Sequence, residues 1–187
     1  MLQYAFKEWA VICRALELGK QSILLRKGGI AEDFRLEHQR FWFFSTYVHQ
    51  QQDGIRPDAA SWLEAAMRDR PPAGKVRLSH WAEATGIRQL RDLAPALRLA
   101  PLHFWSDETV RKRFEYRVPG LNVFAVRVHR AETPVEIDDT AEYQGCRSWV
   151  TLDQALPTAG STPVLDDAAF RDVTQRLEVV LNPTATA

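Results

Sequence analysis

The turn that follows the apolar run 23–25 carries residue types suited to binding an anion. Arg26 and Lys27 stand directly before Gly28 and Gly29. Glycines let backbone N–H groups approach a phosphate, and the two cationic side chains add charge and hydrogen-bond donors. The spacing matches neither the phosphate-binding loop of nucleoside triphosphatases nor the dinucleotide-binding G-x-G-x-x-G. Two interpretations stay open: a phosphate-binding turn, and the more common solvated strand end with a glycine turn.

A second basic region lies further along the chain, near two aromatic residues. Trp105 and Tyr116 accompany it, and such combinations can bind a nucleic-acid backbone. We assign Arg113 and Arg127 as secondary ligand-binding residues. The acidic segment 132–142 offers another interpretation, in which it neutralises these cations on a solvated surface. The basic residues are Arg111, Lys112, Arg113, Arg117, Arg127 and Arg130.

Five side chains are candidates for acid–base chemistry: Glu37, His38, His49, Asp107 and Glu108. Histidine titrates near neutral pH, and a carboxyl group whose pKa is raised by burial can act as a general acid. The more ordinary roles are histidines hydrogen-bonded to backbone at strand ends and carboxylates that cap a helix. No spacing of Cys and His is typical of a metal site, so we predict neither a metal nor a cofactor.

The composition limits the classes of function. Among 187 residues, 24 Lys and Arg balance 24 Asp and Glu, so bulk attraction to nucleic acid is weak and only a local basic patch remains. The two cysteines, Cys13 and Cys146, are best explained as free thiols in a reducing compartment. Lys7 and Glu8 stand where a signal peptide would need an apolar stretch, so we expect none, and no apolar run comes near the roughly 20 residues of a membrane span. We therefore expect a cytoplasmic protein.

The pattern of apolar residues predicts an α+β fold, with a mixed, largely antiparallel sheet and flanking helices. We expect a hairpin over 9–25, because its glycine at position 19 suits a turn. The acidic segment 132–142 is expected at an edge or in a loop. One domain over 1–182 and a disordered tail over 183–187 complete the prediction. Further strands are expected at 41–48, 76–81, 122–129 and 148–150, and helices at 59–67, 90–97, 107–114, 151–156 and 167–181.

Several short strings resemble, together and in this order, the bacterial family catalogued as domain of unknown function 1802. The resemblance covers nearly the whole chain. Some relatives are joined to a restriction-endonuclease-like domain, so the resemblance implies a nucleic-acid context without implying an activity. The strings are K-E-W (7–9), L-L-R-K-G-G-I (24–30), T-Y-V-H-Q (46–50), F-W-S-D-E (104–108), G-C-R-S-W-V (145–150) and P-V-L-D-D-A-A-F (163–170).

The order of predicted elements also resembles a Nudix fold. In that fold a strand of the L-L-x-R type precedes a catalytic helix, and a strand bearing Trp precedes a late helix; here 24–26, the helix from Ala59 and Trp149 take these places. The Nudix helix needs R-E-x-x-E-E, whose carboxylates hold Mg²⁺. This helix offers only Glu64 and Asp69, so the usual metal site is missing.

Three functions are consistent with these features. The first is a binding module for a phosphate-bearing ligand, a nucleotide or nucleic acid, at the glycine turn. The second is a Nudix-like phosphohydrolase whose metal ligands have moved to Glu37, Glu64, Asp107 or Glu108. The third is a non-catalytic subunit that binds a protein partner through exposed aromatic residues, with Trp42, Phe43, Trp62 and Trp105 as candidates.

Overall fold

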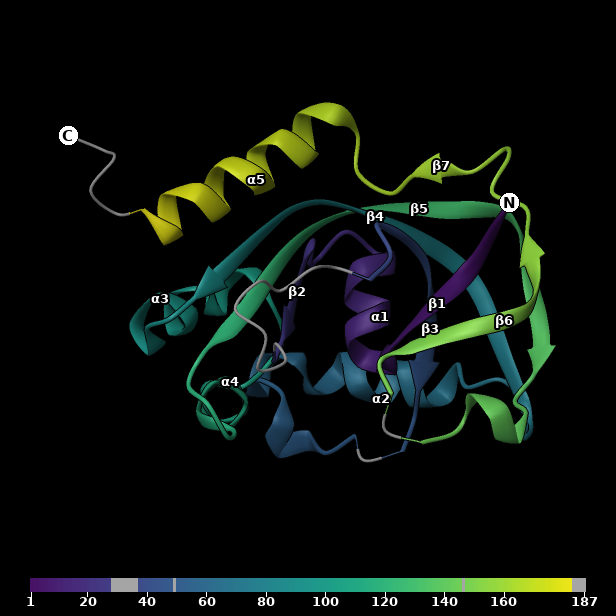
Figure 1. The fold of residues 1–187 in the computed structure, drawn as a ribbon, viewed down its shortest axis with the longest axis horizontal. Helices are drawn as coiled ribbons and strands as arrows, with labels where there is room; N and C mark the ends of the chain where they lie inside the picture. Colours follow the sequence, from purple (N-terminus) through teal and green to yellow (C-terminus); the bar gives the residue numbers. More distant parts are fainter. Residues whose placement is uncertain (28–36, 49, 146, 183–187) are drawn as a thin grey trace.

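The computed structural model describes residues 1–27, 37–48, 50–145 and 147–182, which form a curved sheet packed with helices (Figure 1). The strand order is β2–β5–β4–β3–β1–β6, with β7 beside β5. Among the described strands, β1 and β3 pair in parallel and the other pairs are antiparallel. The predicted α+β class with a mixed, largely antiparallel sheet is confirmed. The strands are β1 (Leu2–Trp9), β2 (Ile23–Arg26), β3 (Arg40–Thr46), β4 (Lys75–Leu90), β5 (Leu121–Asp138), β6 (Trp149–Leu156) and β7 (Thr162–Pro163).

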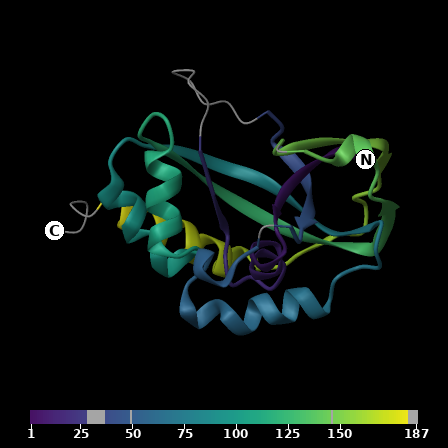
Figure 2. The ribbon, with the colours of Figure 1, turned by 90° about the horizontal axis from the view of Figure 1, so that it is seen from below.

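The helices surround the sheet on several sides. Figure 1 shows α1 inside the curve of the sheet and α5 outside it, and Figure 2 shows α2 along one side and α3 and α4 together at one end. Within the described part of the chain, no helix is both long and apolar enough to cross a membrane. The helices are α1 (Ala10–Glu17), α2 (Ala60–Arg68), α3 (Leu93–Arg98), α4 (Asp107–Glu115) and α5 (Asp167–Leu181).

The aromatic strand β3 is buried on both faces. Successive side chains of a strand point to opposite sides, so Phe41 and Phe43 join one apolar cluster while Trp42 and Phe44 join another. The first cluster lies between the sheet and the helices. The second lies where β1, β3, β6 and parts of β4 and β5 curl around one another. This double burial explains why the strand carries large apolar residues without alternation.

The segment predicted as a hairpin is instead a helix between two strands, so that prediction was wrong. Six of the eight residues of α1 are buried, because the sheet curves around this helix. Ile12, Cys13 and Leu16 lie at helical spacing after Trp9, but Trp9, Val11 and Cys13 also alternate as in a strand, so the pattern did not separate the two and the glycine favoured the hairpin. Gly19, taken as a hairpin turn, stands just after the helix with φ of 66° and ends it. Burial also raises the pKa of the Cys13 thiol on this helix.

Three further boundaries differ from the predictions. The acidic segment continues β5 as far as Asp138, where Lys75 of β4 faces Asp138 and Arg77 faces Glu136. Its carboxylates therefore pair with β4 instead of neutralising the basic region. The expected helix at 151–156 is wrong, because β6 runs on to Leu156 against β1. The expected helix at 90–97 starts only at Leu93, and Leu90 still belongs to β4.

The Nudix-like order of elements is not supported. The strand that carries Leu24, Leu25 and Arg26 is β2, and it pairs with β5. The segment before it forms α1 and so cannot be its hairpin partner. The helix placed in the catalytic position, α2, has an exposed Glu64 that pairs with Arg68 at 3.8 Å.

Two titratable groups with opposite pKa shifts meet at the end of α1. Glu17 Oε1 lies 3.6 Å from His80 Nδ1, and Ser79 Oγ lies 2.9 Å from the same nitrogen. Burial raises the pKa of Glu17 to about 7, with the Arg14 guanidinium opposing and the Asp69 carboxylate adding to the rise. Burial, together with the Arg130 charge, lowers the pKa of His80 to about 4.

We expect Glu17→Gln to stabilise the fold at pH 8 by about 2 kcal/mol and to leave it unchanged at pH 4.5. The carboxyl pKa is higher in the folded chain, so the folded state holds its proton longer, and the wild type loses stability as pH rises from about 4.5 to 7. His80 contributes the opposite slope as pH falls from 6.5 to 4, and the variant leaves that slope in place. Urea unfolding at several pH values measures both. A variant less stable than wild type at pH 8 would contradict the assignment.

Candidate functional site

The carboxyl ends of the parallel strands β1 and β3 meet at one edge of the sheet. Trp9 pairs in register with Thr46, and the Thr46 hydroxyl donates a 3.1 Å hydrogen bond to the backbone oxygen of Glu8. The next residue, Ala10, begins α1, whose first N–H groups therefore lie at the same edge. Side chains from both strand ends line the hollows found here.

One hollow at this edge, of about 430 Å³, has six cationic side chains in its described lining, and we call it the basic hollow. Only two carboxylates, Glu8 and Asp139, belong to its described lining. This excess of positive charge makes the basic hollow suited to an anionic ligand. Its cationic residues are Lys7, Arg26, Arg70, Lys75, Arg113 and Arg147.

These cations differ in whether their charged groups already bind other groups of the protein. Lys7 donates to backbone oxygens of the segment 143–145, and Lys75 is paired with a carboxylate on the facing strand β5. Arg70 is exposed and lies over the Tyr47 ring at 5.1 Å from its centroid. Arg147 is exposed as well. Arg70 and Arg147 are therefore the cations of the basic hollow most open to a ligand.

A buried charge cluster formed by Glu8, Arg26 and Arg113 underlies the hollow. The Glu8 side chain is only 1 % exposed, and its Oε2 lies 3.7 Å from Arg26 Nη2. Glu8 Oε1 accepts a 2.8 Å hydrogen bond from the N–H of Trp9, at the start of α1. The Arg26 guanidinium also donates to the backbone oxygen of Lys7. The carboxylate thus pairs with Arg26, accepts from the backbone just before α1, and acts on the nearby Arg113 through its charge.

Aromatic rings support both arginines of the charge cluster. The Arg26 guanidinium lies 4.2 Å from the centroid of the Phe6 ring, and that of Arg113 lies 3.6 Å from the centroid of the Trp105 ring. Such contacts offset part of the cost of removing a cation from water. Burial still lowers the pKa of Arg113 to about 10, while Glu8 raises it and Arg26 lowers it further.

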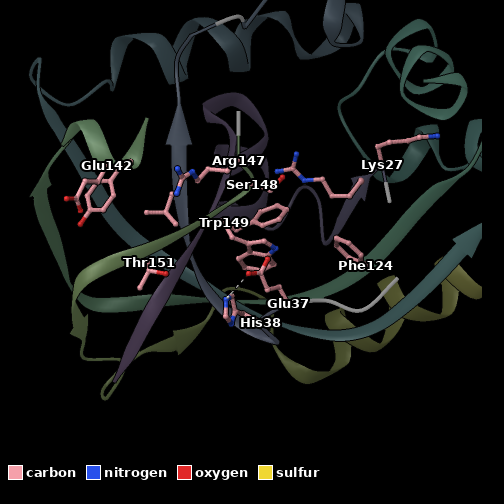
Figure 3. A pocket seen from close by; sticks show the side chains of 13 residues that line it. Lys27, Glu37, His38, Phe124, Glu142, Arg147, Ser148, Trp149 and Thr151 are labelled. Carbon is pink, nitrogen blue, oxygen red and sulfur yellow. Dashed lines mark ion pairs between the residues drawn. The ribbon is translucent and has the colours of Figure 1, made fainter. Parts of the chain in front are cut away.

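A second hollow, of about 720 Å³, adjoins the first, and we call it the aromatic hollow (Figure 3). It shares Arg26, Arg147 and Ser148 with the basic hollow. In Figure 3, Arg147 and Ser148 lie on one side of Trp149, and Glu37 and His38 lie on the other. The ring-bearing residues of the aromatic hollow are Phe6, His38, Phe124, Tyr143 and Trp149.

Lys27, a predicted phosphate ligand, binds backbone oxygens in this structure. Its Nζ donates to Phe114 O at 2.8 Å, to Gly120 O at 3.0 Å and to Val118 O. Phe114 lies in the last turn of α4 and the other two residues follow the helix, where the helix dipole favours a positive charge. Lys27 therefore anchors the segment after α4, although its side chain also borders the aromatic hollow.

The other predicted ligand-binding residues are dispersed. Arg26 and Arg113 come together in the charge cluster, as described above. Arg127 instead pairs with Asp167 of α5 and lies over the Phe170 ring at 5.3 Å. It lines neither of these two hollows, nor a third beside the start of α4, nor a fourth of about 50 Å³ between α1 and α2, and these are the four described hollows. Gly28 and Gly29 lie outside the described residues.

The acid–base candidates fall into separate places. Glu37 and His38 line the aromatic hollow with Glu37 Oε1 and His38 Nε2 at 3.9 Å, and the His38 ring is stacked on Tyr4. Asp107 and Glu108 begin α4, and Glu108 pairs with Lys112 at 2.5 Å beside a third hollow. His49 lies outside the described residues. In the described chain no three His, Cys, Asp or Glu side chains gather as metal ligands would.

The proposed exposed aromatic surface is also corrected. Trp42, Phe43 and Trp105 are buried in the apolar clusters, and Trp62 packs against Phe104. Conversely, sequence reasoning missed Glu8 and Arg147. A single carboxylate inside the otherwise apolar alternation of β1 was a signal for Glu8, whereas nothing local distinguished Arg147 from any other exposed arginine.

We expect Glu8→Gln to destabilise the fold by about 3 kcal/mol, because it leaves two largely buried guanidinium groups without their carboxylate. Urea unfolding near pH 7 measures the change. Glu64→Gln is the matched control, since it removes the same charge from an exposed pair on α2 and should change stability far less. If both variants lost the same free energy of unfolding, the charge cluster would contribute no more to stability than an exposed ion pair does.

Comparison with solved structures finds crystal structures of ASCH from Zymomonas mobilis. The native protein is 15% identical to this chain with a TM-score of 0.48, covering 92% of this chain and 93% of that one. A point mutant of the same protein gives 15% identity and 0.48, covering 92% and 94%. Likeness of this degree establishes neither a shared site nor a shared activity. A search of curated proteins finds no match.

A family model provides the firmest comparison. The model described as "Domain of unknown function (DUF1802)" matches residues 5–176, which contain β1 from its fourth residue on, the other described strands, the charge cluster and the described lining of both hollows. The resemblance noted from the short strings is thereby confirmed, and the chain belongs to the DUF1802 family.

Proposed function

We propose that this chain is a binding module for a phosphate-bearing ligand, a nucleotide or nucleic acid, and that the ligand's phosphates lie in the basic hollow. The observation that carries the proposal is the excess of cations around this hollow, six side chains against two carboxylates in the described lining. The chain as a whole has no net charge, yet an excess of cationic side chains lines the basic hollow. Such local fields attract anions even when the whole protein is neutral.

The charge cluster strengthens this assignment. The Glu8 side chain is 1 % exposed, pairs with Arg26 and accepts a hydrogen bond from the N–H of Trp9 just before α1. Its negative charge is therefore offset inside the fold and does not repel a ligand strongly. Arg70 and Arg147 remain at the surface with their guanidinium groups open to solvent. Guanidinium groups match the geometry of phosphate oxygens and bind them through paired hydrogen bonds.

A metal-dependent phosphohydrolase has less support. Its proposed ligands, Glu37, Glu64, Asp107 and Glu108, are distributed over the aromatic hollow, α2 and the start of α4. Hydrolysis assisted by Mg²⁺ needs carboxylates close enough to share an ion. A restriction or nucleic-acid-processing context, and a protein partner, stay predictions that rest on the family resemblance and on composition.

Charge reversal at the exposed arginines tests the proposal. We expect Arg147→Glu and Arg70→Glu each to weaken binding of labelled oligonucleotides by about tenfold or more, because each removes a charge-assisted contact. Each lost phosphate contact should also reduce the slope of log affinity against log salt by about 0.7 for a single strand. Fluorescence anisotropy over a salt series measures both quantities, and labelled nucleotides serve as a second ligand.

Arg176→Glu is the matched control, because Arg176 is exposed on α5 and lines none of the four hollows in the described chain. It makes the same change in net charge, so it should affect binding little. If the control weakens binding as much as the two variants, attraction is general and the basic hollow is not the site. If the wild type binds no nucleotide and no nucleic acid, the proposed function is refuted.

A further inference from the structure

We infer that the ligand is a single-stranded nucleic acid, with one unpaired base in the aromatic hollow and the adjoining phosphates in the basic hollow. This inference rests on the proposed function and narrows it to one class of ligand. It follows from how the two hollows are joined, how their charges differ, and what their walls are made of.

The two hollows adjoin each other and share three lining residues. Arg26, Arg147 and Ser148 line both of them. A ligand that fills the two hollows together must therefore pass these three residues. A nucleotide unit has the required form, because its base and its phosphate are held apart by the sugar. Arg26 and Arg147 stand where they can contact the phosphate nearest to the inserted base.

The charges of the two hollows favour different parts of a nucleotide. The aromatic hollow is lined by the carboxylates Glu37 and Glu142 and by three cations, Arg26, Lys27 and Arg147, and the ammonium of Lys27 is directed to three backbone oxygens. Beyond the two arginines that it shares with the basic hollow, a phosphate there would meet two carboxylates and an ammonium that is already bound. A base is neutral, and its N–H groups can donate hydrogen bonds to carboxylates. The basic hollow, with its excess of cations, suits the phosphates instead.

The walls of the aromatic hollow suit a flat ring. Trp149 is only partly buried and meets the buried Phe6 ring edge to face at 4.8 Å, while the Arg26 guanidinium covers Phe6, so the Trp149 indole and the Arg26 plane are the surfaces on which a base can stack. Bases stack on aromatic rings and on guanidinium planes alike. A volume of about 720 Å³ is within the range of hollows that hold compact ligands, and it accommodates a base with its sugar.

A duplex does not meet these requirements. Its bases are paired and stacked inside the helix, so none is free to enter the aromatic hollow unless it is flipped out, which costs free energy. Unpaired strands present their bases and phosphates together, as the two joined hollows require. The inference therefore predicts a preference for single strands over duplexes of the same sequence.

The test uses the full chain and labelled oligonucleotides of about six nucleotides, within the span of known single-strand sites, made as both RNA and DNA. Fluorescence anisotropy compares each intact strand with strands carrying one abasic position, with the duplex and with mononucleotides. We expect one internal abasic position to weaken binding by about tenfold, because stacking of that base is lost. The RNA and DNA arms decide which strand is preferred.

A variant that fills the aromatic hollow gives a second readout. Thr151 is exposed on β6 and lines the aromatic hollow, so Thr151→Tyr should abolish the abasic effect and leave the salt slope unchanged. Gln154→Tyr adds the same ring to an exposed position of β6 outside the four described hollows, and should bind as wild type does. Matched thermal unfolding of both variants checks that each is folded.

The outcomes separate the two proposals. If strands bind through Arg147 but no abasic position matters, or if duplexes or mononucleotides bind as tightly as strands, the single-strand inference is overturned and the proposed function stands. If no nucleic acid and no nucleotide binds, the proposed function itself falls. An abasic effect that Thr151→Tyr removes and Gln154→Tyr keeps supports the inference.

Discussion

The attraction between the buried Glu8 carboxylate and the guanidinium groups of Arg26 and Arg113 is the constraint on which the functional end of the molecule depends. Glu8 belongs to β1, Arg26 ends β2 and Arg113 lies on α4. In the sheet, β1 and β2 are separated by β3, β4 and β5. Arg26 nevertheless reaches the backbone oxygen of Lys7, and Arg113 reaches that of Leu25 at 3.3 Å. The cluster thus links two distant strands and a helix around the open side of the curved sheet.

Burying three charges is costly, and the surroundings show how the cost is offset. Each guanidinium has an aromatic ring beneath it, Phe6 or Trp105, and each donates to a backbone oxygen. The carboxylate accepts from the N–H of Trp9, the last residue before α1, and so lies near the helix N-terminus, where the helix dipole favours negative charge. Buried ion pairs seldom make a fold more stable than apolar side chains of similar size would, but their partners must be held in one particular arrangement. Here that arrangement sets the floor of the basic hollow.

Part of this organisation is readable in the chain. The aromatic run of β3, the cap and apolar face of α5, and Ser106 as the cap of α4 all obey local rules, and the structure has them near the predicted places. Arg26 was identified from its neighbourhood of charge and glycine, and it does lie between the two hollows. Local rules were ambiguous for α1, because its apolar residues fit a helix as well as a strand. They placed the acidic segment at an edge or in a loop but did not show that it continues β5, because two of its carboxylates are matched by cations on β4 that are distant in sequence.

The sequence by itself therefore determined the α+β class, the positions of the well-capped helices, the aromatic core strand and the absence of any motif for a known metal or nucleotide site. Only the tertiary structure decided which charges meet. Lys27 and Arg127 were as good candidates as Arg26 in the sequence, yet one anchors the segment after α4 and the other pairs with α5. Glu8, Arg113 and Arg147 come from three remote segments, and the curvature of the sheet brings them to one edge. Local propensities act over a few residues, whereas electrostatic partnership depends on distance in space, which the chain reveals only once it is folded.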